Sequence, residues 1–330
     1  MGRVFRIFGV VCLLAAAAVG GALWWEFGWL ATPGPLSVAR TIVIDKGQTP
    51  AAIGRQLGAE GVLTHDFAFA PAYWITRLDG DLRAGEYAFP AGVTPQGVLD
   101  LLRSGKTIVH RLVVPEGLTT AEVLDLVAHG EALTGEVTDR PGEGQLWPAT
   151  YAYSYGEKRQ TLVEQMKRLA ARNLAELWAA RAPDVPLERP EQAVVLASIV
   201  EKETALPAER PKVAAVIYNR LRLGMKLQVD PTVAYAVTEG RHPLDHALTK
   251  AELALDSPYN TYLVTGPPPG PIANPGKASL EAVLKPERSD FLYFVADGSG
   301  GHAFASTLEE HNRNVAHWRQ IEAGHTAGTK

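Results

Sequence analysis

The stretch Glu191-Gln-Ala-Val-Val-Leu-Ala-Ser-Ile-Val-Glu-Lys-Glu-Thr204 predicts a mostly apolar helix that carries a carboxylate, Glu201, near its C-terminal end. Positions three, four and seven before a helical residue share its face. Before Glu201 those positions hold small or medium-sized side chains: Ser198, Ala197 and Val194. Such a face leaves room beside the carboxyl group and little water around it. Burial raises the pKa of a carboxylic acid, and a Glu that stays protonated near neutral pH can protonate a leaving oxygen.

Glu201 could instead have a purely structural role. Glu201 could form an ion pair with Lys202 or Arg210, a common fate for a charge at a helix end. Glu203 lies two positions on, about 200° further round the helix, so we expect it to face elsewhere.

The amino-acid composition excludes several classes of function and binding site. The chain has 330 residues, of which 46% are hydrophobic and 21% charged, as in ordinary globular proteins. The net charge of −4 argues against a nucleic-acid surface as the main function. The single cysteine, Cys12, excludes an internal disulfide framework and a cysteine-based zinc site. His242 and His246 have the spacing of a metal pair, but Pro243 lies between them. We therefore expect neither a metal nor a cofactor.

The N-terminus is not globular. An uncharged, almost wholly apolar run from Ile7 to Trp25 follows Arg3 and Arg6. A helix needs roughly 20 such residues to cross a bilayer. Because positive flanks stay in the cytoplasm, we expect a single-pass anchor in the cytoplasmic (inner) membrane, with the rest of the chain on the outer, periplasmic side. A cleaved signal peptide is the alternative, although its apolar region usually spans only about 7–15 residues.

Beyond the anchor, alternating strand and helix patterns predict an α+β protein. The densest polar and proline-rich motifs lie after residue 190. The predicted organisation is a cytoplasmic N-terminus (1–6), a transmembrane helix (7–25), a linker (26–38), a small α+β module (39–115), a connecting α+β region (116–190), a mixed α/β catalytic domain (191–322) and a disordered tail (323–330).

Several long motifs occur in one order along residues 194–305: Leu196-Ala-Ser-Ile-Val-Glu-Lys-Glu-Thr204, Tyr218-Asn-Arg-Leu221, Met225-Lys-Leu-Gln-Val-Asp-Pro-Thr232, Ser257-Pro-Tyr-Asn-Thr-Tyr262, Gly270-Pro-Ile-Ala-Asn-Pro-Gly276 and Tyr293-Phe-Val-Ala296. With these motifs the chain resembles the endolytic murein transglycosylase (YceG-like) family. The N-terminal module, with Ala84-Gly-Glu-Tyr87, resembles a LysM-like peptidoglycan-binding fold.

The resemblance implies a fold and an activity. The fold would be a transmembrane helix, a LysM-like α+β module and a catalytic domain with a lysozyme-like buried Glu at a helix end. The activity would be cleavage of the MurNAc-GlcNAc β-1,4 bond within nascent peptidoglycan strands, which leaves 1,6-anhydroMurNAc ends and helps to terminate strand elongation. The family's single catalytic Glu maps onto Glu201. Glycan strands and the membrane would be the partners, with peptidoglycan synthases as further candidates.

Polar and aromatic residues of the neighbouring motifs are candidate substrate contacts. Asp230 would either stabilise positive charge near C1 or fix the turn at Pro231. Asn219 would orient Glu201 or cap a turn. The remaining candidates would hydrogen-bond or stack on sugar, or else brace loops: Gln228, Asn260, Tyr262, Tyr259 and Tyr235.

Two other functions fit the same residues. One is a non-catalytic scaffold that binds peptidoglycan at the membrane. The other is a hydrolysing muramidase that uses Asp230 as the base, because hydrolysis requires a second carboxylate.

Overall fold

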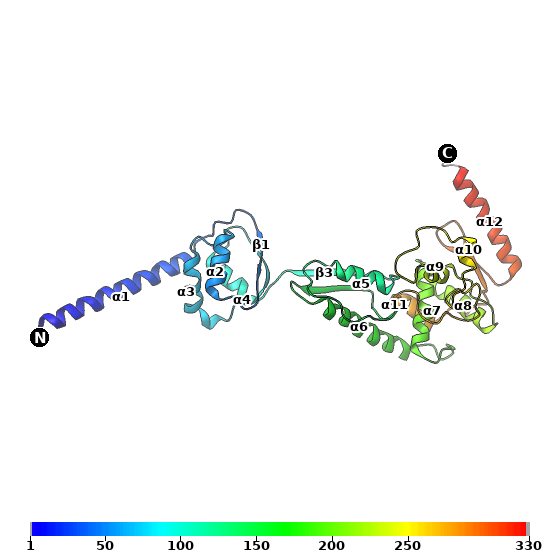
Figure 1. The fold of residues 1–330 in the computed structure, drawn as a ribbon, viewed down its shortest axis with the longest axis horizontal. Coiled ribbons are helices and arrows are strands. Elements are labelled where there is room, and N and C mark those ends of the chain that lie inside the picture. Colours follow the sequence, from blue (N-terminus) through cyan, green and yellow to red (C-terminus); the bar gives the residue numbers. More distant parts are fainter. Residues whose placement is uncertain (1, 328–330) are drawn as a thin grey trace. The chain divides into compact units, whose positions relative to one another are not determined.

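The computed structural model describes the backbone of residues 2–327, and the chain divides into two compact units. The first consists of the chain up to His110 together with Tyr153–Gly156, and the second of Arg111–Ala152 together with the chain from Glu157 onward. Both units combine helices with short two-stranded sheets, which confirms the predicted α+β class (Figure 1).

The first unit contains one long helix and a small α+β module. Its elements are α1 (Gly2–Leu30), β1 (Arg40–Ile44), α2 (Pro50–Ala59), α3 (Asp66–Ile75), a short 3₁₀ turn η1 (Arg77–Asp79), β2 (Gly85–Phe89) and α4 (Pro95–Ser104). Strands β1 and β2 pair antiparallel, with Arg40 opposite Phe89 and Ile44 opposite Gly85. Helices α2 and α4 begin with Thr49 and Thr94 as N-caps and a proline at the first helical position, which suit the start of a helix.

Helix α1 extends beyond the apolar run. The segment Ile7–Leu30 is long and apolar enough to cross a membrane. The predicted linker from residue 26 is helical as far as Leu30, because Trp29 and Leu30 insert into the module core. They join the core residues Ile44, Leu57 and Phe69 there. The end of the helix is therefore packed against the module and does not lead into a free linker.

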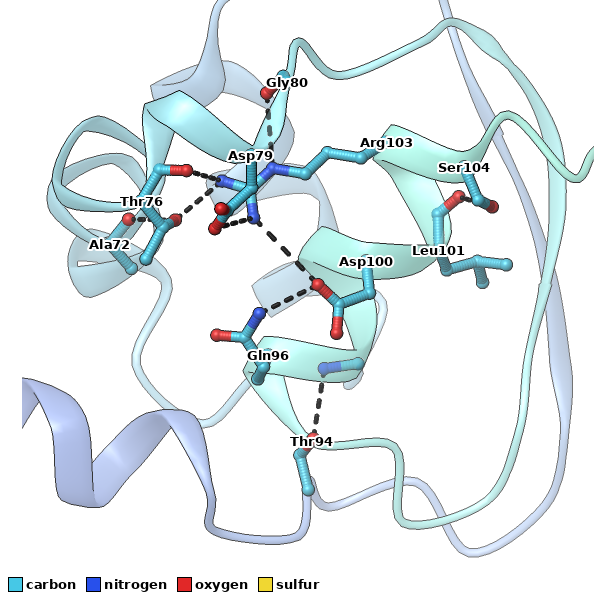
Figure 2. A network of polar contacts seen from close by, with 11 residues as sticks. Ala72, Thr76, Asp79, Gly80, Thr94, Gln96, Asp100, Leu101, Arg103 and Ser104 are labelled. Carbon is cyan, nitrogen blue, oxygen red and sulfur yellow. Dashed lines mark hydrogen bonds and ion pairs between the residues drawn. The ribbon is translucent and has the colours of Figure 1, made fainter.

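A buried arginine fixes the connection after α3 (Figure 2). Arg103 of α4 donates to the carbonyl and the hydroxyl oxygen of Thr76, at 2.9 and 2.6 Å, and to the carbonyl of Gly80 at 3.3 Å. Its side chain is only 6% exposed and lies near the carboxylates of Asp79 and Asp100. The arginine thus ties the end of α3 to α4, although the carbonyl of Thr76 also accepts the backbone N–H of Asp79.

Replacing Arg103 by Met is expected to lower the free energy of unfolding by about 2 kcal/mol, since several charge-assisted hydrogen bonds are lost at a buried site. Chemical denaturation of the purified full chain measures the change. Arg55→Met, at an exposed position of α2, is the matched control. Equal stability of the two variants would contradict a bracing role for Arg103.

The second unit is mostly helical. Its elements are α5 (Thr120–Ala128), α6 (Arg159–Ala179), α7 (Pro190–Glu203), α8 (Arg210–Arg222), α9 (Asp230–Thr238), α10 (Lys250–Leu253), α11 (Lys277–Leu284), β5 (Tyr293–Ala296), β6 (His302–Ala305) and α12 (Leu308–Ala327). Strands β5 and β6 form an antiparallel hairpin. Strands β3 (Val109–Val113) and β4 (Thr150–Ser154) pair with each other, and the division between the units passes through both.

Helix α7 lies at the centre of the second unit. It contacts α6, α8, α9 and α11, and the residues from Ala193 to Val200 are almost all buried. Around it, α8 and α11 contribute apolar partners such as Ile217 and Val283. The final helix, α12, reaches Ala327, so the stretch from 323 that the sequence predicts to be disordered is helical to that point. Residues 328–330 of the predicted tail lie outside the described residues.

Candidate active site

Local sequence sets both ends of α7. Pro190 occupies the first helical turn, and the side-chain oxygen of Gln192 accepts the backbone N–H of Arg189 at 3.0 Å. Thr204 adopts an extended conformation and ends the helix directly after Glu203. The Glu-Lys-Glu sequence therefore lies in the last turn, with its two carboxylates on different sides of the helix.

One side of α7 holds the proline-rich loop. The hydroxyl of Ser198 accepts the backbone N–H of Ile272 at 3.0 Å, and a carboxylate oxygen of Glu201 accepts that of Gly276 at 2.9 Å. Ser198 also donates to the carbonyl of Val195 at 2.7 Å. These two polar side chains, three residues apart, attach the 272–276 segment to the helix.

Glu201 is sheltered but paired. Its side chain is 6% exposed, and its second carboxylate oxygen accepts a hydrogen bond from Nη2 of Arg210 at 3.1 Å. The structural alternative raised by the sequence, an ion pair with Arg210, is therefore observed. Glu116 lies 4.0 Å from the same guanidinium, and burial together with the charge of Glu201 raises the pKa of Glu116. Glu201 thus lies in a cluster of two carboxylates around one arginine.

Glu203 has the raised pKa that the sequence analysis expected for Glu201. It has no hydrogen-bond or ion-pair partner among the residues that the structure describes. Burial raises its pKa to about 8, and the negative charge of Asp230 adds to the effect. A carboxyl group in this state is protonated at neutral pH and has a free oxygen to offer to a ligand.

Asp230, whose charge contributes to the raised pKa of Glu203, lies at the start of α9, where the helix dipole stabilises a carboxylate. The phenol of Tyr262 donates to Asp230 at 2.5 Å. Thr261 aligns the two loops, because its backbone and side-chain oxygens accept the N–H groups of Gln228 and Val229, both at 3.1 Å. Burial and the negative charges of Asp230 and Glu203 raise the pKa of Tyr262, which keeps its proton available for donation.

Arg220 secures the loop before Asp230. Its guanidinium donates to the carbonyls of Leu227 and Leu292, at 2.7 and 2.6 Å, and lies 5.2 Å from the ring centre of Tyr293. Gln228 follows with φ of +52°, an unfavourable left-handed conformation for a residue with a side chain. Its side chain is exposed beside Arg220, so it remains available for a substrate contact.

Two of the candidate asparagines brace loops in the structure. Asn260 is 0% exposed, donates to the carbonyls of Leu253 and Leu255 at 3.0 and 2.8 Å, and accepts the N–H of Tyr262 at 3.0 Å. Asn219 is also buried and donates to the carbonyls of Ser289 and Phe291 at 2.8 and 2.9 Å. Both amides therefore brace loops, which for Asn260 is the alternative to sugar contact that the sequence left open, and among the described residues Asn219 forms no hydrogen bond with Glu201.

Tyr259 lies in a different environment from Tyr262. Its ring packs against Tyr235, with 4.9 Å between the centroids, and Tyr235 donates to the buried Glu143 at 3.5 Å. A cavity of about 640 Å³ is lined by Glu143, Trp147 and the 267–271 prolines, but not by Glu203, Asp230 or Tyr262. Tyr235 and Tyr259 therefore lie with Glu143 and not with Glu203, Asp230 and Tyr262.

Metal-ligating side chains do not gather in the described part of the chain, where no group of three or more His, Cys, Asp or Glu is placed to hold an ion. His246 instead pairs with Asp245 and Glu252, each at 2.9 Å.

Sequence reasoning missed Glu203, although a signal was present. The positions three and four residues before it hold Val200 and Ile199, which are both 0% exposed. Two fully buried apolar side chains on its face reduce the water around a carboxyl group and so raise its pKa.

Comparison with known proteins places the chain in a family. The model of the YceG-like family matches residues 42–317. An endolytic murein transglycosylase of Bacillus subtilis (strain 168) is 39% identical over 192 residues, covering 56% of this chain and 51% of that protein. An endolytic murein transglycosylase of Streptococcus pneumoniae serotype 2 is 28% identical over 323 residues, which cover 84% of this chain and 58% of that protein. The chain therefore spans only 51–58% of the length of these relatives.

A solved structure of a YceG-like protein is similar to this chain. A crystal structure of a YceG-like protein from Listeria monocytogenes aligns with a TM-score of 0.55 and 30% identity, over 83% of this chain and 98% of that one. Since the family model covers most of the chain, this protein belongs to the YceG-like family.

Proposed function

We propose that this protein is an endolytic lytic transglycosylase, which cleaves the MurNAc-GlcNAc β-1,4 bond within nascent peptidoglycan strands. The observation that carries the proposal is Glu203, a partly buried carboxyl group that has no hydrogen-bond partner among the described residues and whose pKa is raised to about 8. The names of the similar proteins add support, because the matched relatives are endolytic murein transglycosylases.

Glu203, rather than Glu201, is the proposed acid and base. Glu201 already accepts hydrogen bonds from Arg210 and Gly276, so both of its oxygens are engaged. Glu203 is protonated at neutral pH and can donate its proton to the glycosidic oxygen as the bond from that oxygen to C1 breaks. The resulting carboxylate then removes the proton from the C6 hydroxyl as O6 bonds to C1. The product is a 1,6-anhydroMurNAc end, and no water is consumed.

Asp230 and Tyr262 assist in this proposal without transferring the proton. The carboxylate of Asp230, which is close enough to Glu203 to raise its pKa, stabilises positive charge that develops at C1. The phenol of Tyr262 holds Asp230 in place through the 2.5 Å hydrogen bond. Gln228, exposed on the same loop, contributes a substrate contact.

The N-terminal half places this chemistry at a membrane in the same proposal. Helix α1 serves as a retained anchor in the cytoplasmic membrane, with the module that follows it and the second unit on the outer side, because Arg3 and Arg6 precede the apolar run. The module after it acts as a LysM-like glycan-binding element, strand cleavage terminates elongation, and peptidoglycan synthases are the candidate protein partners.

Mass spectrometry of the products tests the reaction. Purified protein and uncrosslinked glycan strands are expected to yield fragments with anhydro ends, which are lighter than reducing ends by one water. Reducing ends would instead support a hydrolysing muramidase with Asp230 as the base. Binding without any cleavage would support a non-catalytic scaffold.

The pH dependence is expected to follow the acid. Because Glu203 must carry a proton to act, cleavage should be sustained at neutral pH and fall as the pH rises through about 8. Asp230→Asn removes a neighbouring negative charge, so the pKa of Glu203 drops and the alkaline decline moves to lower pH.

Initial rates measured across the pH range for wild type, Asp230→Asn and the exposed control Asp256→Asn provide the measurement. An unchanged alkaline limb in Asp230→Asn would contradict the coupling of the two carboxylates.

A further inference from the structure

Helix α3 of the first unit has two apolar faces, of which the fold buries only one. Ala68, Phe69, Ala72 and Tyr73 point into the module core. A second row of side chains stays exposed at helical spacing and continues into the η1 turn: Phe67, Pro71, Trp74, Ile75 and Leu78, termed here the α3 stripe. Phe67 is 68%, Trp74 56% and Leu78 102% exposed. A contiguous exposed apolar row of this kind marks an interaction surface.

The stripe begins at the end of the apolar helix. The ring of Trp25 in α1 stacks on the ring of Phe67, with the ring centroids 5.9 Å apart and an angle of 6° between the ring planes. Trp25 also stacks on Trp29, whose side chain is buried in the module core. In Figure 1, α3 lies on the side of the module from which α1 enters. Phe67 therefore lies level with the aromatic residues that end the membrane-spanning candidate.

The chemistry of the stripe matches a membrane–water interface. Trp side chains concentrate at that level of a bilayer, and basic residues beside them interact with lipid phosphates. Arg77 lies over the ring of Trp74, with its guanidinium carbon 4.9 Å from the centroid, and is itself exposed. An apolar row with an adjacent cation is typical of helices that lie in the interface plane.

The stripe is held rigidly. Arg103 binds both oxygens of Thr76 and the carbonyl of Gly80, on either side of Leu78 (Figure 2). The exposure of Trp74 and Leu78 therefore does not result from a frayed helix end. Because α1 is packed into the same core, insertion of α1 brings this fixed row to the bilayer surface.

We propose that the α3 stripe docks on the outer surface of the lipid bilayer, so that the first unit lies on the membrane as a second contact beside α1. The proposal rests on the retention of α1 as an anchor. It adds a lipid-binding surface to the proposed enzyme, and it does not depend on which glutamate is the acid.

Site-directed fluorescence on the full chain tests this docking. In a Cys12→Ser background, an environment-sensitive dye is attached to Leu78→Cys, and the protein is reconstituted in phosphatidylglycerol–phosphatidylethanolamine vesicles. Nitroxide-labelled lipids are expected to quench this dye about threefold more strongly than a dye at Lys46→Cys, in the exposed turn before α2. Leu78 makes a suitable position because its side chain is fully exposed, so substitution does not disturb the core.

A third dye at Leu14→Cys separates the two assumptions. Quenching at Leu14 with no excess at Leu78 over Lys46 would overturn the docking and leave the anchor intact. Absence of quenching at Leu14 would overturn both. Protection of the Leu78 dye from water by added glycan strands, without lipid quenching, would assign the stripe to glycan and overturn the membrane proposal.

Discussion

Glu203→Gln is expected to reduce the rate of anhydro-end formation by about a thousandfold, because the amide can neither donate nor accept the transferred proton. The amide is close to the protonated carboxyl group in size and charge, so the fold should remain intact. Anhydro-ended fragments released from uncrosslinked strands, quantified by mass spectrometry, provide the measurement. Circular dichroism establishes that the variant is folded.

Glu201→Gln is the matched control, two residues away in the same helical turn. This variant loses its ion pair with Arg210 but keeps Glu203 and Asp230. Its activity, corrected for the folded fraction, should stay within about tenfold of wild type, as expected for a residue that does not exchange the proton. The reverse pattern, an inactive Glu201→Gln and an active Glu203→Gln, would return the catalytic role to Glu201.

Arg210→Met is expected to lower the free energy of unfolding by about 3 kcal/mol, because it leaves the carboxylate of Glu201 buried without its charge partner. Glu201 would retain only the N–H of Gly276, and the carboxylate of Glu116 lies near the same arginine. Chemical denaturation at neutral pH measures the loss. The 11% exposure of the Arg210 side chain means that water cannot easily replace the lost guanidinium.

The double variant Glu201→Gln/Arg210→Met is the control for this effect. Because it removes both charges, it should be more stable than Arg210→Met alone. Additive losses from the two single substitutions would show that the pair is not coupled, and that the cost comes from lost packing around Arg210.

Much of the architecture could be predicted from local sequence. The apolar run of α1 and the apolar helix α7 were predicted, because both depend on neighbouring residues. The continuation of α1 to Leu30 was not predicted, because it depends on Trp29 and Leu30 finding a place in the core of the module.

In the candidate site, too, some residues could be identified from the sequence, whereas the contacts of others are seen only in the structure. Asp230 and Tyr262 were identified from their motifs, and the structure brings them together. Asn260 was identified by the same argument and is instead buried, since an amide can serve a loop or a ligand equally well. Its two backbone partners, Leu253 and Leu255, settle which role it has.

By itself the sequence determined the helix that carries Glu-Lys-Glu, the apolar N-terminal run and membership of the family. It also determined that the two glutamates face different directions, because helical rotation depends only on their spacing. Only the tertiary structure decided what each face meets. Arg210 and Gly276 close around Glu201, whereas buried surroundings and the charge of Asp230 keep a proton on Glu203. Burial and charge act through space, so their sources lie in segments far apart along the chain.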